Sequence, residues 1–147
     1  AYDPFVPADI MAMEGVEKVE LEDLFTRADI LSLHLPLTAE TRHFINAARL
    51  AEMKKSAVIV NTARGPLIDT VALAAALQAG TIGGAGIDVF EQEPLPPDHA
   101  LRSAPGALLT SHVAWYSESS IPRLQRLAAE ELVRGVRGEP LKNHVNK

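Results

Sequence analysis

Three polar residues stand where successive apolar stretches of the chain end, and a fourth follows closely. Arg64, Asp88 and His112 end stretches rich in small and β-branched apolar residues, and Glu93 lies shortly after Asp88. In a parallel sheet the carboxyl ends of the strands meet at one edge, and ligands of open α/β sheets bind in the crevice beyond it. The spacing therefore predicts that these four side chains converge on one crevice.

The chemistry that this set suggests is proton transfer beside an anionic substrate. Arg64 would bind a carboxylate through two parallel hydrogen bonds, which a lysine could not reproduce, and it could polarise an adjacent carbonyl. Histidine is the side chain whose ordinary pKa lies near neutrality, so His112 suits a general acid and base. Glu93, in contact with His112, would orient the imidazole and favour its protonated form.

Each of these residues also fits a structural role when it is taken singly. Arg64 could be an ordinary solvated arginine at a strand end, and Asp88 could cap a turn. Glu93 could be solvated, and His112 could be a buried histidine whose hydrogen bonds are satisfied. Their joint placement at the ends of successive strands is what favours a functional site.

Metal binding is the rival chemistry for a set that contains histidine and carboxylates. Metal sites built on histidine usually contain two ligands at close spacing. No such pair stands out among the histidines of this chain: His34, His43, His99, His112 and His144. We therefore expect no metal site.

The elements that would position these residues alternate between strands and helices. The apolar patterns predict a short edge strand at 16–20 and further strands at 29–36, 57–62, 83–89 and 107–112. Helical spacing of apolar residues predicts helices at 21–27, 47–53, 70–79 and 121–136. This alternation is typical of an α/β fold with a mostly parallel sheet and right-handed crossovers.

Local signals sharpen three of these predictions. Asp69 is a predicted N-cap for the helix at 70–79, and Gly80 takes the position after its end. The glycines within 83–86 predict that another segment packs closely against the backbone of that strand. The Pro-rich, acidic loop at 91–105 is long for a compact domain, and loops of that length are usually functional.

Composition and charge exclude several classes of protein. The formal net charge is −5 and no cluster of Lys and Arg is present, which argues against a nucleic-acid surface. No apolar run approaches the roughly 20 residues of a membrane span. The chain contains no Cys, which excludes disulfides and is compatible with the cytoplasmic location that we expect.

The first residues resemble the end of a strand, so we expect the chain to be a fragment of a longer protein. The prolines within 2–7 favour an extended segment. Asp3 could bind the diol of a ribose there, or it could be an ordinary turn residue before Pro4. No glycine-rich phosphate-binding fingerprint is present, because the glycines at 84–86 enter a strand and do not open a helix.

Several motifs, in order along the chain, resemble the D-isomer-specific 2-hydroxyacid dehydrogenases. They are Leu35-Pro36-Leu37-Thr38, Asn61-Thr62-Ala63-Arg64-Gly65, Asp69, Gly86-Ile87-Asp88-Val89-Phe90-Glu91-Gln92-Glu93-Pro94 and Ser111-His112. The stretches 114–118 and 141–147 are more narrowly similar to the C-terminal-binding-protein branch, which comprises NAD(H)-binding corepressors. Ser111 stands where the family usually has Pro, and Phe90 stands where the corepressor branch usually has His. Phe90 therefore favours an ordinary dehydrogenase of bacterial type over the corepressor branch.

The resemblance implies a role for each site residue. It implies that Arg64 binds substrate and takes part in catalysis, that His112 is the general acid and base, and that Glu93 is its partner. The remaining implied roles concern the cofactor and the substrate pocket: Asp88 near the nicotinamide carboxamide, Asp3 on the adenosine ribose with a preference for NAD over NADP, Pro36 and Thr62 lining the cofactor cleft, and Trp115 beside the substrate. By composition alone, Trp115 fits a half-buried core aromatic equally well.

The resemblance also implies a domain plan and a function. Residues 1–138 would be the C-terminal part of a Rossmann-like NAD-binding domain without its glycine-rich first βαβ unit. Residues 139–147 would be a tail towards a substrate domain. The expected activity is hydride transfer between NAD(H) and a small 2-hydroxy or 2-keto acid in a homodimer paired through this domain, with the fragment alone inactive. The alternative is an NAD(H)-sensing binding protein of the corepressor type.

Overall fold

The structure, a computed structural model, describes residues 1–142 of the chain. It divides into two compact units, which begin at Ala1 and at Val113 and meet in sequence after His112. The predicted tail at 139–147 falls outside the described residues from position 143 onward.

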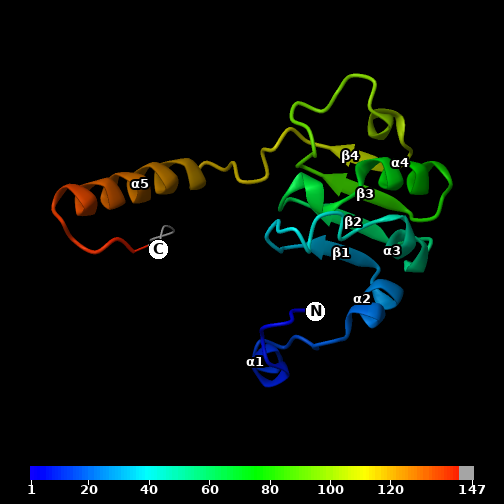
Figure 1. Cartoon of the computed structure of the whole chain (residues 1–147), viewed down its shortest axis with the longest axis horizontal. Coiled ribbons are helices and arrows are strands. Elements are labelled where there is room, and N and C mark those ends of the chain that lie inside the picture. Colours follow the sequence, from blue (N-terminus) through cyan, green and yellow to red (C-terminus); the bar gives the residue numbers. More distant parts are fainter. Residues whose placement is uncertain (143–147) are drawn as a thin grey trace. The chain divides into compact units, whose positions relative to one another are not determined.

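The first unit is built on a four-stranded sheet, and the prediction of an α/β fold is confirmed. The strands are β1 (Ile30–Leu33), β2 (Val58–Asn61), β3 (Gly84–Ile87) and β4 (Ala107–Leu109). They lie in the order β1-β2-β3-β4, and every pair of neighbours is parallel (Figure 1). All four carboxyl ends therefore lie at the same edge of the sheet.

The predicted helices are confirmed with small shifts at their ends. They are α2 (Leu21–Arg27), α3 (Ala47–Glu52), α4 (Thr70–Gln78) and α5 (Ser120–Val136). The structure adds elements that the sequence pattern did not predict: α1 (Ala8–Met13), and the 3-10 helices η1 (Gly65–Leu67) and η2 (Ala100–Ser103). The two 3-10 helices have three and four residues, too few to display a helical period in their apolar residues.

The edge strand predicted at 16–20 is wrong. These residues are not part of any strand. Two of them form backbone hydrogen bonds with Ala1, in the arrangement found between parallel strands. The Ala1 amino group donates to the Glu17 carbonyl at 2.6 Å, and the Ala1 carbonyl accepts from the Val19 N–H at 3.0 Å. A ladder needs several successive residues on both sides, and here one residue supplies all the pairing.

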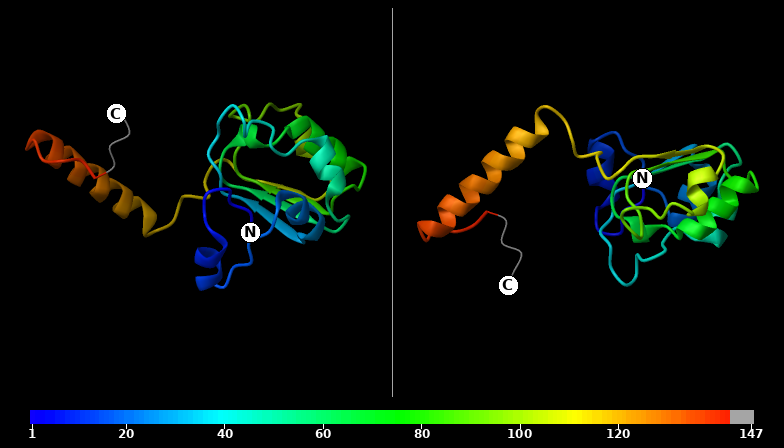
Figure 2. Two further views of the ribbon diagram at one scale, coloured as in Figure 1. Left: turned by 60° about the horizontal axis from the view of Figure 1, so that its bottom comes forward. Right: turned by 90° about the horizontal axis from the view of Figure 1, so that it is seen from above.

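The connections place the helices on one face of the sheet. Strands in sequential order joined by right-handed crossovers carry their helices on the same side, and Figure 2 shows α3 and α4 together there. Burial alternates accordingly along β1, where Leu31 and Leu33 are buried while Ile30 is 70% exposed. The fully buried core lies between the helices and this face, and it includes Phe25, Ile45, Leu50, Ile59, Leu67, Leu73, Ile87 and Leu101.

Two local predictions are confirmed at atomic detail. The Asp69 carboxylate accepts hydrogen bonds from the N–H groups of Val71 (3.1 Å) and Ala72 (2.9 Å), as an N-cap should. A Cβ at Gly83 would lie 2.8 Å from the carbonyl oxygen of Ser56, so the close backbone contact expected beside this strand is present.

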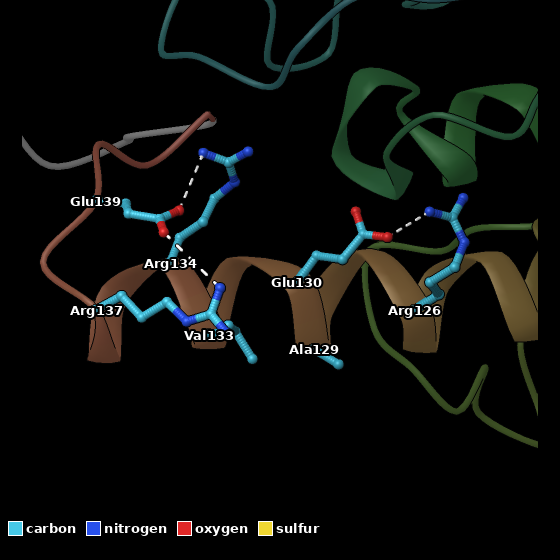
Figure 3. A pocket seen from close by; sticks show the side chains of 7 residues that line it. All are labelled: Arg126, Ala129, Glu130, Val133, Arg134, Arg137 and Glu139. Carbon is cyan, nitrogen blue, oxygen red and sulfur yellow. Dashed lines mark hydrogen bonds and ion pairs between the residues drawn. The ribbon is translucent and has the colours of Figure 1, made fainter.

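The second unit contains α5, and none of the residues of this helix is buried. Figure 3 shows its charged side, where Arg126 pairs with Glu130 at 2.5 Å. Arg134 and Arg137 both approach Glu139, at 3.8 and 3.9 Å. Nowhere in residues 1–142 does a helix have the length and apolar character that crossing a membrane requires.

Candidate active site

Backbone hydrogen bonds continue past the strand ends and place the predicted site residues side by side. The N–H of Asp88 donates to the Asn61 carbonyl at 3.0 Å, and the N–H of His112 donates to the Asp88 carbonyl at 2.8 Å. The last residue of β2 and the residues that follow β3 and β4 are therefore hydrogen-bonded side by side. The structure thus brings Asp88 and His112 together at the predicted edge.

Arg64 lies in a tight turn that is fixed by the residue ending β2. The Asn61 side chain is fully buried, and its amide nitrogen donates to the Arg64 carbonyl at 2.9 Å. Its oxygen accepts from the Ala63 N–H at 3.0 Å. The Arg64 side chain is exposed, with Nη1 donating to the Ala63 carbonyl at 2.6 Å. These two hydrogen bonds hold the backbone of the turn, and the Arg64 side chain is exposed beyond the carboxyl end of β2.

Glu93 and His112 form the predicted pair. The His112 Nδ1 lies 2.8 Å from Glu93 Oε2, while Glu93 Oε1 accepts from the Phe90 N–H at 3.0 Å. The hydrogen bond from His112, and then that from Phe90, holds the pKa of Glu93 below its ordinary value of 4.5. Because a carboxylate can only accept, Nδ1 carries the hydrogen of this bond. Proton exchange with a substrate would then use Nε2.

His112 has a backbone conformation that few residues other than glycine adopt. Its φ is 56°, in the left-handed region. This turn ends β4 at Leu109, three residues earlier than the predicted end of the strand. Such outliers persist where the surroundings fix them, and they cluster at functional sites.

Asp88 is a buried acidic residue, with 3% of its surface exposed. Its carboxylate accepts a hydrogen bond of 2.5 Å from the Thr110 hydroxyl. Thr110 was missed by the sequence reasoning, although its position two residues before His112 puts it beside Asp88 in a parallel pair of strands.

Of the other residues predicted to bind the cofactor, Thr62 and Pro36 lie after strands of the sheet, and Asp3 lies near the N-terminus. Thr62 is exposed directly after β2, and Pro36 is exposed after β1, with its carbonyl accepting from the Thr41 hydroxyl at 2.7 Å. Asp3 lies in the N-terminal segment that precedes α1. Its Oδ1 accepts from the N–H groups of Phe5 (2.8 Å) and Val6 (3.1 Å), so the turn role foreseen for it is present.

Trp115 belongs to the second unit. The residue is 53% exposed, and its ring meets the ring of Tyr116 edge-on, with 5.6 Å between centroids. As for metals, no group of three or more His, Asp or Glu side chains that could hold an ion occurs in the described part of the chain.

The parallel sheet, with polar residues in register beyond its strand ends, defines half of a dinucleotide-binding fold of the Rossmann type. Residues 1–114 match the family model for the D-isomer specific 2-hydroxyacid dehydrogenase, NAD binding domain. The chain belongs to this family.

Individual relatives agree with this membership. The chain is 47% identical over 133 residues to a glyoxylate reductase from Thermofilum pendens, covering 90% of this chain and 39% of that protein. It is 44% identical over 137 residues to an (S)-sulfolactate dehydrogenase from Chromohalobacter salexigens, covering 92% and 44%. Among solved structures, D-lactate dehydrogenase with NAD+ from Lactobacillus jensenii superposes with a TM-score of 0.89 at 28% identity, covering 100% and 48%. The chain thus spans less than half the length of these relatives.

Proposed function

We propose that this protein is an NAD-dependent D-2-hydroxyacid dehydrogenase that interconverts a small 2-keto acid and its 2-hydroxy acid. The observation that carries the proposal is the hydrogen-bonded pair of His112 and Glu93, at 2.8 Å, on the same sheet edge as Arg64. The relatives named above act, by their names, on glyoxylate and sulfolactate, which are acids of this class.

The residues at the carboxyl edge fit a dinucleotide. Asp88 is buried and held by Thr110, which suits a fixed acceptor for a carboxamide, and Thr62 and Pro36 lie exposed beyond β2 and β1. In this proposal these three residues line the cofactor cleft, and Asp3 binds the adenosine ribose. When bound, NADH supplies the hydride that adds to C2 of the keto acid.

Arg64 binds the substrate carboxylate in this proposal. Its exposed guanidinium offers paired N–H donors whose geometry matches a carboxylate, and its backbone is fixed by Asn61. Held in this way, it also stabilises the negative charge that develops on the carbonyl oxygen. Trp115 is proposed to line the substrate pocket, on the strength of the family resemblance.

His112 donates the proton that the reduced carbonyl oxygen needs. The proton leaves Nε2 as the new O–H bond forms, and it returns there when the hydroxy acid is oxidised. Glu93 fixes the tautomer by accepting from Nδ1 and stabilises the imidazolium that exists before the transfer. The lowered pKa of Glu93 keeps this carboxylate ionised at neutral pH.

The same proposal includes the domain plan and the cellular setting. Residues 1–138 would form the C-terminal part of an NAD-binding domain that pairs two subunits, and 139–147 would lead to a substrate domain. The small fraction of each relative that the chain covers supports this plan. Membership of the corepressor branch, cytoplasmic location and lack of contact with nucleic acid stay predictions.

The test is NADH oxidation by the full-length protein with a panel of small 2-keto acids, alongside NADH binding. We expect turnover of at least one acid, and a loss of turnover of about a hundredfold or more in Arg64→Ala with NADH binding retained. Turnover unchanged in Arg64→Ala would reject its role. NADH binding without turnover of any acid would reject the dehydrogenase and favour the NAD(H)-sensing alternative.

A further inference from the structure

We propose that Glu91, which lies two residues before Glu93, is a positioning residue for the acid–base pair. Its carboxylate fastens the loop that carries Glu93 to the segments that follow β1 and β2, and so holds Glu93 within reach of His112. The kinetic consequence rests on the proposed function, whereas the structural consequence does not.

The Glu91 carboxylate is bound through both oxygens by residues far away in sequence. Oε1 lies 2.6 Å from Nε2 of His43 and 3.6 Å from the guanidinium of Arg42, both in the segment after β1. Oε2 accepts from the Thr70 hydroxyl at 2.7 Å and from the Thr70 N–H at 3.3 Å, at the first residue of α4. A side chain on an acidic loop is thereby fixed to two other connections.

Each hydrogen bond in the chain from His99 through Thr70 to Glu91 has a defined donor and acceptor. The Leu101 N–H donates to Nδ1 of His99 at 3.2 Å, so Nδ1 bears no hydrogen and Nε2 does. This Nε2 lies 3.3 Å from the Thr70 hydroxyl, which in turn donates to Glu91. The middle of the 91–105 loop, at His99, therefore contacts the same threonine as the beginning of the loop, at Glu91.

Gly65 makes the loop sit directly on the turn that carries Arg64. A Cβ at Gly65 would lie 1.9 Å from the carbonyl oxygen of Phe90 and 2.6 Å from the nitrogen of Glu91. The same Phe90 donates its N–H to Glu93. The peptide group between Phe90 and Glu91 therefore packs directly against the turn that carries Arg64. On one side of this peptide, Phe90 binds Glu93; on the other, Glu91 binds His43 and Thr70.

The charge of Glu91 is stable under ordinary conditions. Its side chain is 25% exposed. Partial burial acts to raise the pKa of Glu91, but the hydrogen bonds from His43 and Thr70 outweigh it and lower the pKa below 4.5. His43 is itself fixed, with φ at 50° and its N–H donating to the Pro66 carbonyl at 2.8 Å.

The direct test is an NMR titration of the Glu93 carboxyl carbon in the full-length protein. We expect Glu91→Ala to raise the Glu93 midpoint towards 4.5, since the Phe90 and His112 contacts that lower it are loosened. Removal of a nearby negative charge would by itself lower this midpoint. The sign of the change therefore separates a loss of position from a loss of charge.

Glu91→Gln is the conservative variant, since its amide can still accept from Thr70, and we expect it to restore most of the wild-type midpoint. Gln92→Ala is the matched control at the neighbouring exposed position, and it should leave the midpoint unchanged. If Glu91→Ala does not fold, Thr70→Val and His43→Asn each remove one partner of Glu91, and asparagine tolerates the positive φ of position 43.

Kinetics give the second readout. In the full-length protein we expect Glu91→Ala to lower kcat by about tenfold to a hundredfold while the Kd for NADH stays within about twofold, because a misplacement of catalytic groups by about 1 Å has effects of that size. A Glu93 midpoint that stays the same or falls in Glu91→Ala, or in both partner variants, overturns this proposal. Absence of turnover in the wild type would instead overturn the proposed function and leave the NMR result to stand.

Discussion

The two units of the molecule stabilise their helices in different ways. In the first unit α4 buries Leu73 and Leu77 against the sheet and begins at an Asp69 cap with two hydrogen bonds. In the second unit α5 buries no residue, and its Ser119 cap position makes no side-chain hydrogen bond to the helix. Core packing therefore fixes α4, whereas no residue of α5 takes part in a core within the described part of the chain.

This difference indicates which interactions hold the residues of the candidate site in place. Exposed ion pairs such as Arg126–Glu130, whose side chains are 61% and 41% exposed, contribute little to stability. The turn at Arg64 and the loop at Glu93 instead rest on the buried Asn61 and on the backbone contact at Gly65. We expect substitutions to have large effects in the first unit and small effects in α5.

The largest contrast should come from matched leucines. Leu73 is fully buried and Leu132 is 69% exposed. We expect Leu73→Ala to lower the free energy of unfolding by about 2–5 kcal/mol, because it loses buried contacts and leaves a cavity. Leu132→Ala should change it by less than about 0.5 kcal/mol. Urea unfolding followed by circular dichroism measures both, and equal losses would remove the contrast between the units.

Glycine substitutions sharpen the role of the loop contact. Gly65→Ala places a methyl group on the Phe90 carbonyl, and we expect a loss of about 3 kcal/mol. Gly80→Ala is the control, since its φ of 65° disfavours Ala but nothing lies within 4 Å, and it should lose about 1 kcal/mol. If Gly65→Ala unfolds at the same urea concentration as Gly80→Ala, the loop at Phe90 moves away from position 65 with little loss of stability, which would contradict this prediction.

Helix caps give a smaller contrast. We expect Asp69→Ala to lower the free energy of unfolding by about 1 kcal/mol, since it removes two hydrogen bonds at the start of α4. Ser119→Ala should have almost no effect, because its side chain makes no cap bond to α5. The same urea assay applies, and a Ser119→Ala loss as large as that of Asp69→Ala would contradict the comparison.

Acid should weaken the first unit through Glu91 and Glu93. Both carboxyl groups have folded-state pKa values below 4.5, so the unfolded chain binds more protons as the pH falls through that range. Their stabilisation is complete above pH 4.5 and is lost as the pH falls through the lower, folded-state values. In unfolding measured on both sides of that pH, Glu91→Gln and Glu93→Gln should each lose less stability than the wild type. A steeper loss in either variant would contradict the direction of the shifts.

Much of the fold could be predicted from local pattern. The helix at α2, the Asp69 cap and the four parallel strands each follow from a few neighbouring residues: apolar spacing, a capping residue, or a β-branched run. The pairing of His112 with Glu93 also followed, since parallel strand ends meet at one edge. By contrast, the 3-10 helices η1 and η2 have three and four residues, which leaves no apolar period to detect.

The rest of the site depends on contacts between distant positions. Glu91 looks like a solvated acid in a loop, and its partners His43 and Thr70 lie 48 and 21 residues away. The role of Gly65 likewise requires the path of the Phe90 backbone. Asn61 is an exception, because an asparagine that ends a buried strand just before a turn is a known turn former and could have been predicted.

The most direct test of the account is a double-mutant cycle on Glu93 and His112 in the full-length protein. Turnover of the 2-keto acid would be measured for Glu93→Gln, His112→Ala and the double variant, with NADH binding in parallel. If Glu93 acts through His112, the double variant loses no more kcat than His112→Ala alone, whose loss should be about a hundredfold or more. Losses that multiply in the double variant, or a His112→Ala variant with wild-type turnover, would contradict the account.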